Sequence, residues 1–323
     1  MVTKLYDIRR LITVMTLSVV ACVAMAQSDA AFSHFWAGPS YYNPAAAGEY
    51  NAVHLTLGSR MQWVDFRHAP VNFYVTADMP YKLMEQRMGV GVKAEYERIG
   101  LYSNTRIGAQ IAYKRKIRKN TLSVGVQPGV FSQTFRGGEA ITGGEEGDDK
   151  VIPKQNVSGT AFDANVGVFF SNPKFWAGFA VTHVTSPRVE LKISRESIDY
   201  YEFQLSRGYY FTGGGNIPIN NTLFEIQPSA MFAAYNNIWT AQAATVLRYN
   251  RMFNIGVGYR WKDAATAFIG VHLKDAYIGY AYDYPVSEIS RATFGSHEVF
   301  VTYNVKLDNR EKNKNKQKSV RLM

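Results

Sequence analysis

The sequence predicts an all-β protein: a single transmembrane antiparallel β-barrel of about fourteen strands with an N-terminal periplasmic or plug-like segment. Three observations predict this fold. Apolar and polar side chains alternate in recurring segments of about ten residues. No apolar run after residue 26 approaches the roughly 20 residues that a transmembrane helix needs. Aromatic residues are abundant, with 21 Tyr, 19 Phe and 5 Trp, as is typical of such barrels.

Residues 1–26 have the pattern of a signal peptide. Basic residues precede the apolar stretch 11–24, and Ala24-Met25-Ala26 offers a small-x-small cleavage pattern. An alternative lipoprotein cleavage site would leave Cys22 lipidated. Cleavage after Ala26 removes the only cysteine and lowers the formal net charge from +10 to +8. The exported chain then cannot contain a disulfide scaffold, a thiolate metal site or a cysteine nucleophile.

The alternation defines each expected strand of the barrel, assigned to residues 53–306. In residues 53–63, Val53, Leu55 and Leu57 share one face and His54 and Arg60 the other, because side chains two apart point the same way. Thirteen more segments follow: 71–79, 88–96, 106–114, 122–130, 162–170, 175–181, 209–217, 224–232, 239–247, 253–261, 265–273, 276–284 and 297–305. An even number is what a single-chain barrel requires when both termini lie in the periplasm.

The connections between these segments sort by length. If the first strand starts in the periplasm, every periplasmic connection is short, and the external ones include 136–160, 185–206 and 285–296, the three longest. Barrels of the outer membrane have this asymmetry. Aromatic residues near the strand ends would form a belt at the lipid headgroups: Trp63, Tyr96, Tyr113, Phe170, Phe175, Tyr259, Trp261, Tyr284 and Tyr303. The alternative is a soluble β-sandwich with these rings in its core.

Residues 27–52 form an N-terminal segment with the sequence Asn43-Pro44-Ala45-Ala46-Ala47-Gly48. Proline fixes φ, and Asn or Gly accepts left-handed geometry, so we expect a turn that leads into the first strand. The alternative is a plug or docking segment in the barrel mouth, because Phe32, Phe35 and Trp36 would otherwise sit in water.

Charged residues on the polar strand faces cannot point to lipid, where Arg or Lys costs about 2–4 kcal/mol at the midplane. We expect them to pair across the lumen as a structural network; a selectivity filter or binding site is the alternative. They are Arg60, Lys93, Glu95, Arg106, Lys114, Asp163, Glu225, Arg260 and Glu298.

Nothing in the sequence predicts an enzyme, a metal site or a cofactor. His54, His272 and His297 lie on expected strands without metal-ligand spacing. Ser296-His297-Glu298 could suggest hydrolase chemistry, but neighbours on a strand point to opposite faces. The acidic stretch 143–149 is expected to be an external loop without the ligand order of an EF-hand. The basic tail 307–323 is expected in the periplasm, where it could touch an acidic partner or peptidoglycan.

Several short sequences carry a family resemblance. They are Phe32-Ser33-His34-Phe35, the Asn-Pro-Ala element with Asn43, Pro44 and Gly48, Arg60-Met61-Gln62-Trp63, and Gly295-Ser296-His297-Glu298. In this order they resemble the PorP/SprF family of Bacteroidetes outer-membrane proteins, associated with type IX secretion and gliding motility. The resemblance implies a structural or docking role for Asn43, Pro44, Gly48, Arg60, Gln62, Trp63, Gly295, His297 and Glu298. The chain departs from the family at Val305, where an aromatic residue is usual.

The resemblance implies a Gram-negative outer membrane as the location. Its implied partners are periplasmic type IX ring proteins, surface-exported proteins, or both, together with outer-membrane lipid and no nucleic acid. The leading hypothesis is a non-enzymatic subunit that couples the periplasmic secretion machinery to the outer membrane. The alternatives are an anchor or secretion partner for one exported adhesin, and a general diffusion porin.

Overall fold

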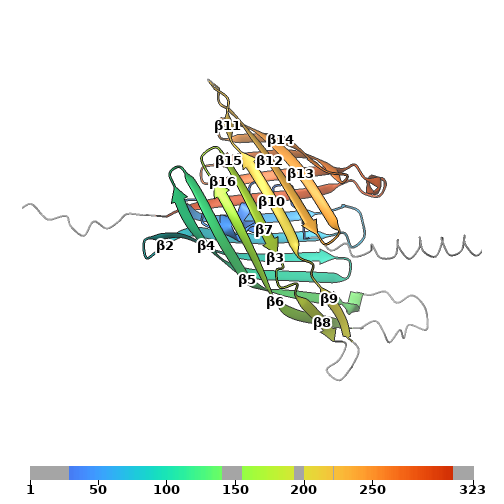
Figure 1. Cartoon of the computed structure of the whole chain (residues 1–323). Coiled ribbons are helices and arrows are strands. Elements are labelled where there is room, and N and C mark those ends of the chain that lie inside the picture. The colour runs from blue at the N-terminus through green and yellow to red at the C-terminus, as the bar shows by residue number, and fades with distance from the viewer. Residues whose placement is uncertain (1–28, 140–154, 193–199, 221, 308–323) are drawn as a thin grey trace, which may run out of the picture.

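The computed structural model describes residues 29–139, 155–192, 200–220 and 222–307 (Figure 1). The expected signal peptide with Cys22, the acidic stretch 143–149 and the basic tail after residue 307 lie outside the described residues. No helix in the described part of the chain is long and apolar enough to cross a membrane.

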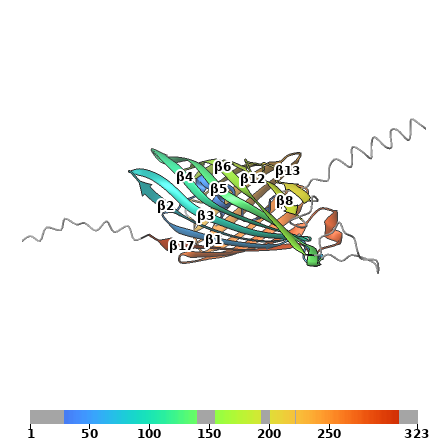
Figure 2. The same cartoon turned by 90° about the horizontal axis from the view of Figure 1, so that it is seen from below.

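Fourteen strands of the described residues form one closed antiparallel sheet (Figures 1 and 2). They are β1 (Ala52–Met61), β2 (Val71–Leu83), β3 (Gln86–Ile99), β4 (Tyr102–Ile117), β5 (Asn120–Arg136), β6 (Asn156–Ser171), β7 (Phe175–Thr182), β10 (Gly208–Gly215), β12 (Phe224–Tyr235), β13 (Ile238–Tyr249), β14 (Phe253–Arg260), β15 (Ala264–Leu273), β16 (Ala276–Pro285) and β17 (Ser296–Lys306). A two-residue strand, β11 (Ile217–Pro218), pairs with β12. A separate hairpin consists of β8 (Arg188–Lys192) and β9 (Tyr200–Gln204).

The first and last strands close the barrel. β1 pairs with β17 from Ala52↔Lys306 to Met61↔His297, and on the other side β10 joins β7 to β12. A closed sheet leaves no strand edge unpaired in the hydrocarbon, where no water could satisfy the backbone. The predicted all-β barrel of about fourteen strands is confirmed.

The two faces of the sheet follow the predicted alternation. In β1, Thr56 and Arg60 are buried inside, whereas Leu57 and Met61 are 41% and 55% exposed on the outside. Outward Tyr96, Tyr259 and Tyr303 of the predicted belt are also exposed. The exterior is therefore apolar and aromatic, and polar side chains line the lumen.

Several strand boundaries differ from the predicted ones, among them those of β1 and β10. β1 ends at Met61, so Gln62 and Trp63 belong to the connection after it, where Trp63 has a φ of +53°. The segment predicted at 209–217 is interrupted at Asn216: β10 ends at Gly215, the Asn216 N–H donates to the carbonyl of Lys174 just before β7, and Ile217–Pro218 pairs with β12 as β11. In both places alternation continues in the sequence after the backbone has left the ladder.

The two ends of the barrel differ. We call the short-turn end the one that holds Ala52, Lys306 and the tight turns, such as Met84-Glu85 and Asn250-Arg251, in which both residues have positive φ as type I′ hairpins require. The long-loop end holds the three longest connections, 137–155, 183–207 and 286–295. The predicted sorting of connections is therefore present.

Candidate functional site

Residues 29–51 lie inside the barrel and run along its lumen. The segment begins at Asp29 near the long-loop end, contains the short helices α2 (Pro39–Tyr42) and η1 (Pro44–Ala46), and reaches the start of β1 at the short-turn end. Figure 2 shows its dark blue ribbon enclosed by the strands. We call residues 29–51 the plug.

An aromatic cluster packs the plug against the barrel wall. The Phe32 ring meets Tyr41 at 5.2 Å and the inward-facing Tyr74 at 4.6 Å between centroids. His34 stacks on Phe300 of β17 at 5.2 Å. Phe32, Tyr41, Tyr74 and Phe300 are all buried. The rings that would otherwise sit in water thus form a core between plug and strands.

Buried charges fix the backbone at the middle of the plug. The Glu298 carboxylate accepts hydrogen bonds from the N–H groups of Ser33 and His34, at 2.7 and 2.9 Å, and from the His34 ring at 2.8 Å. Arg60 pairs with Glu298 at 3.3 Å and with Asp283 at 2.6 Å. Asp283 in turn accepts from the Ser33 hydroxyl at 2.9 Å. Neighbouring strands β1, β17 and β16 together hold two plug residues.

The Asn-Pro turn seats the plug on a wall of glycines. Asn43 caps η1 by accepting from the Ala45 N–H at 2.9 Å, and its side-chain amide donates to the Val168 carbonyl at 2.9 Å. A Cβ on Gly125 would lie 2.4 Å from the Ala45 nitrogen, and one on Gly167 would lie 2.1 Å from the Asn43 side chain. Close approach of the plug to β5 and β6 therefore requires glycine at both positions.

The turn ends at Gly48, which has a φ of +67° and donates its N–H to Asp78 at 2.7 Å. A side chain is strained at this φ, and a Cβ would also lie 2.7 Å from Gly89. Only glycine fits there without a shift of backbone.

Inward-facing polar side chains satisfy the carbonyl groups of the plug. Lys93 donates to the Tyr41 carbonyl at 3.1 Å, Gln110 to the Ser40 carbonyl at 2.7 Å, and Lys114 to the Ala45 carbonyl at 3.3 Å. Lys114 also pairs with Glu49 at 3.0 Å, and the Ser171 hydroxyl donates to Glu49. Burying a backbone carbonyl without a partner is costly, so these donors make the plug's position specific.

A second charged cluster holds the first described residue of the plug. The Asp29 carboxylate lies 3.0 Å from Nε2 of His183 and 3.5 Å from Arg106, and Nδ1 of His183 lies 2.6 Å from Asp163. Burial alone would lower the pKa of His183, but the carboxylates of Asp29 and Asp163 outweigh it and raise this pKa to about 9. Burial would raise the pKa of Asp29, yet His183, Arg106 and Lys93 hold it well below its usual range. Both groups are therefore charged at neutral pH.

The predicted motif residues fall into two groups. Asn43, Pro44, Gly48, Arg60 and Glu298 belong to the plug or contact it. The second group lies at the long-loop end and consists of Gln62, Trp63, Gly295 and His297.

The second group connects the loop after β1 to the loop before β17 by hydrogen bonds. The Val64 N–H donates to the carbonyl of Gly295, whose φ is +106°, and the Trp63 N–H donates to the Ser296 hydroxyl at 3.1 Å. His297 contacts Tyr280 at 2.6 Å and lies on the opposite face of β17 from Glu298. The structure therefore does not bring His297 to the plug.

All nine predicted lumen charges have a partner. Arg106 pairs with Glu95 at 3.0 Å, Lys93 with Glu95 at 3.3 Å, and Arg248 with Glu225 at 3.4 Å. Asp29 and His183 complete one cluster and were not predicted from the sequence; Asp283 was noted only within the family sequence Tyr280-Ala281-Tyr282-Asp283. Ser33 and His34 were noted only within a family motif. No group of three His, Cys, Asp or Glu side chains among the described residues is placed to hold a metal ion.

Comparison with solved structures found several similar proteins. The chain is similar to the toluene transporter TbuX of Ralstonia pickettii, with 14% identity, a TM-score of 0.45 and coverage of 80% of this chain and 90% of that one. The toluene transporter TodX of P. putida is 11% identical, with a TM-score of 0.46 and coverage of 82% of this chain and 92% of that one. The translocator domain of the autotransporter NalP from Neisseria meningitidis is 9% identical, with a TM-score of 0.42 and coverage of 78% of this chain and 88% of that one.

A comparison with curated proteins gave no match. The sequence model of the type IX secretion system membrane protein PorP/SprF matches residues 24–303, which is most of the chain. The chain therefore belongs to the PorP/SprF family of type IX secretion system membrane proteins.

Proposed function

We propose that this chain is a non-enzymatic outer-membrane component of the type IX secretion system that couples the periplasmic machinery to the outer membrane. The observation that carries the proposal is the plug, which occupies the lumen through buried ion pairs, backbone hydrogen bonds and aromatic packing. A barrel whose lumen is occupied by its own chain is suited to anchoring other proteins rather than to diffusion. Membership of the PorP/SprF family indicates that the proteins it would anchor belong to the type IX secretion system.

The orientation of the barrel is part of the proposal. The short-turn end, which holds the start of β1 and the end of β17, faces the periplasm, because outer-membrane barrels have short periplasmic turns and longer external loops. The motif residues Arg60, Glu298, Asn43, Pro44 and Gly48 then serve to hold the plug, and the periplasmic partner binds the adjoining rim.

Photo-cross-linking in cells tests the coupling role. A photoreactive residue replaces Lys119, an exposed side chain in the turn between β4 and β5, and separately replaces Lys262, in a turn at the opposite end. Capture of periplasmic secretion proteins from Lys119 but not from Lys262, identified by mass spectrometry, is expected. Capture of such proteins from Lys262 alone, or from neither position, would contradict the proposal.

One observation favours a second candidate, an anchor for an exported surface protein. The hairpin β8–β9 extends the long-loop end and packs through Val189 and Leu191 on Phe131 and Val157. The packed strands of this hairpin offer an extended surface to a protein outside the cell. A third photoreactive position, at the exposed Gln204 of β9, separates the two candidates, because an anchor would give an exported protein cross-linked there.

A further inference from the structure

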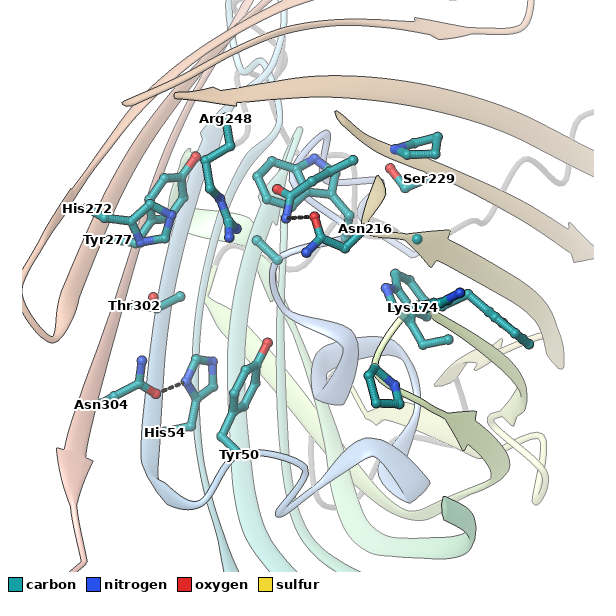
Figure 3. A pocket seen from close by; sticks show the side chains of 18 of the residues that line it. Tyr50, His54, Lys174, Asn216, Ser229, Arg248, His272, Tyr277, Thr302 and Asn304 are labelled. Carbon is teal, nitrogen blue, oxygen red and sulfur yellow. Dashed lines mark hydrogen bonds between the residues drawn. The ribbon is translucent and has the colours of Figure 1, made fainter. Parts of the chain in front are cut away.

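A cavity remains in the lumen beside the plug, at the short-turn end. It has a volume of about 340 Å³ and opens between two walls (Figure 3). His54, Arg248 and His272 line one wall, and Asn216 and Ser229 lie across from them. A volume of this order is usual for a ligand site.

The cavity is lined by cations and hydrogen-bond donors. Lys174 and Lys274 stand at its rim, exposed and without an ion-pair partner among the described residues. Asp275 is its single acidic lining residue and already pairs with Lys306 at 3.0 Å. Nε of Arg248 and Nε1 of Trp36 can only donate, and neither has an acceptor in the described part of the chain. Oε1 of Gln227, which also lines the cavity, has no donor in the described part of the chain, so the ligand that fits supplies acceptor oxygens and negative charge together with a donor such as a peptide N–H.

The surface around the cavity has the same sign. Arg115, Lys116, Arg118 and Lys119 are all exposed at the turn between β4 and β5. Two carboxylates at this end are already paired, Glu49 with Lys114 and Glu225 with both Arg248 and Arg251, so Arg248 offers the cavity its free Nε donor and the unpaired charge comes from the lysines. A partner that approaches this end therefore meets an excess of positive charge.

We propose that this cavity and its basic rim bind an acidic peptide segment, one of whose carboxylates enters the cavity between Arg248, Lys174 and Lys274. A carboxylate matches the donors, and an extended chain that leaves the cavity crosses the basic turn of β4 and β5. The proposal that the peptide belongs to the periplasmic machinery rests on the proposed function. The cavity, its donors and its charge are independent of that function.

Binding of a fluorescent decaglutamate peptide to the purified full chain in neutral detergent tests the site. The expected result is saturable binding that weakens with added salt, as screening requires. The double variant Lys174→Gln/Lys274→Gln, which removes no ion pair, is expected to bind about fivefold more weakly. The matched control is Arg67→Gln/Lys262→Gln, which removes the same charge at the long-loop end and is expected to bind as the wild type does.

A third variant separates the cavity from the charged surface. Ser229→Trp fills the cavity without changing the charge and is also expected to weaken binding. Undiminished binding to Ser229→Trp, or an equal loss in the control double variant, would overturn the proposal. So would an absence of decaglutamate binding combined with a loss of binding to phosphatidylglycerol vesicles in Lys174→Gln/Lys274→Gln, because lipid would then be the ligand.

This experiment and the cross-linking fail independently. Decaglutamate binding needs no other secretion protein, so its absence leaves the coupling role to be judged by the cross-links from Lys119. Conversely, peptide binding without periplasmic cross-links would keep the site and remove the proposed source of its ligand.

Discussion

At the scale of single residues, the Glu298 carboxylate combines contacts that are usually separate. It accepts two backbone N–H groups of the plug and pairs with Arg60, and it is almost fully buried. Ser33 and Glu298 are 265 residues apart in the sequence. The family motif identified Arg60 and Glu298 as notable, but their partner could not be predicted because the contact exists only once the sheet has closed around the plug.

Glu298→Gln is expected to destabilise the protein by about 1–3 kcal/mol, because it removes the charged acceptor of two buried plug N–H groups, whereas Arg60 keeps its closer partner Asp283. The measurement is the thermal unfolding of the barrel in detergent, followed by heat-modifiable gel mobility. Glu202→Gln is the control, since the ion pair of Glu202 with Arg188 is largely exposed and should contribute at most about 1 kcal/mol. Equal stability losses in the two variants would contradict the assigned role of Glu298.

His183 gives the plug a pH dependence. Its pKa of about 9 in the folded protein exceeds the ordinary value of 6.5, so its contribution to stability is complete below pH 6.5 and is lost as the pH rises through 9. The unfolding temperature of the wild type should therefore fall over this range, and His183→Gln should lack that component. His68→Gln, at an exposed loop histidine, should retain it. Identical pH profiles for the wild type and His183→Gln would disprove the link.

At the scale of elements, the alternation of apolar and polar residues predicted the parts of the strands that face lipid. It did not predict the parts of the strands that extend beyond the hydrocarbon. β5 was expected at 122–130 and spans Asn120–Arg136, and β6 was expected at 162–170 and spans Asn156–Ser171. The extra residues pack under the hairpin β8–β9, where Phe131 and Val157 point inward. Outside the hydrocarbon an outward side chain need not be apolar, so period-two patterning no longer marks the strand. The hairpin itself had no lipid-facing pattern and was not predicted.

The plug shows the same limit for an irregular element. Its aromatic residues and its Asn-Pro-Ala turn predicted either a simple turn or a lumen segment, and patterning alone could not choose between them. The choice depends on the glycines of β5 and β6 that admit Ala45 and Asn43 at close range. In the sequence those glycines occupy positions on the polar faces of the strands, like many other residues. The need for glycine there becomes clear only from the close contact with the plug.

At the scale of the whole molecule, plug and barrel form one body because each supplies what the other lacks. The strands bring buried charges that require partners, and the plug brings backbone groups and aromatic rings that require burial. Neither part is well satisfied alone. The proposed anchoring role rests on this mutual dependence, because the lumen charges of a diffusion porin face water instead.

Conductance in planar bilayers measures this distinction. The wild type is expected to carry little or no steady current, and a variant that lacks residues 29–47 to conduct, because its polar lumen would fill with water. Adding a synthetic peptide of residues 29–47 should close the current again. Glu298→Gln keeps the plug but weakens its attachment, so this variant should show intermittent channel openings. It replaces the deletion variant in the test if the deletion variant does not fold. A wild-type current as large as that of the deletion variant would show that the plug does not seal the barrel, and the porin would become the better account.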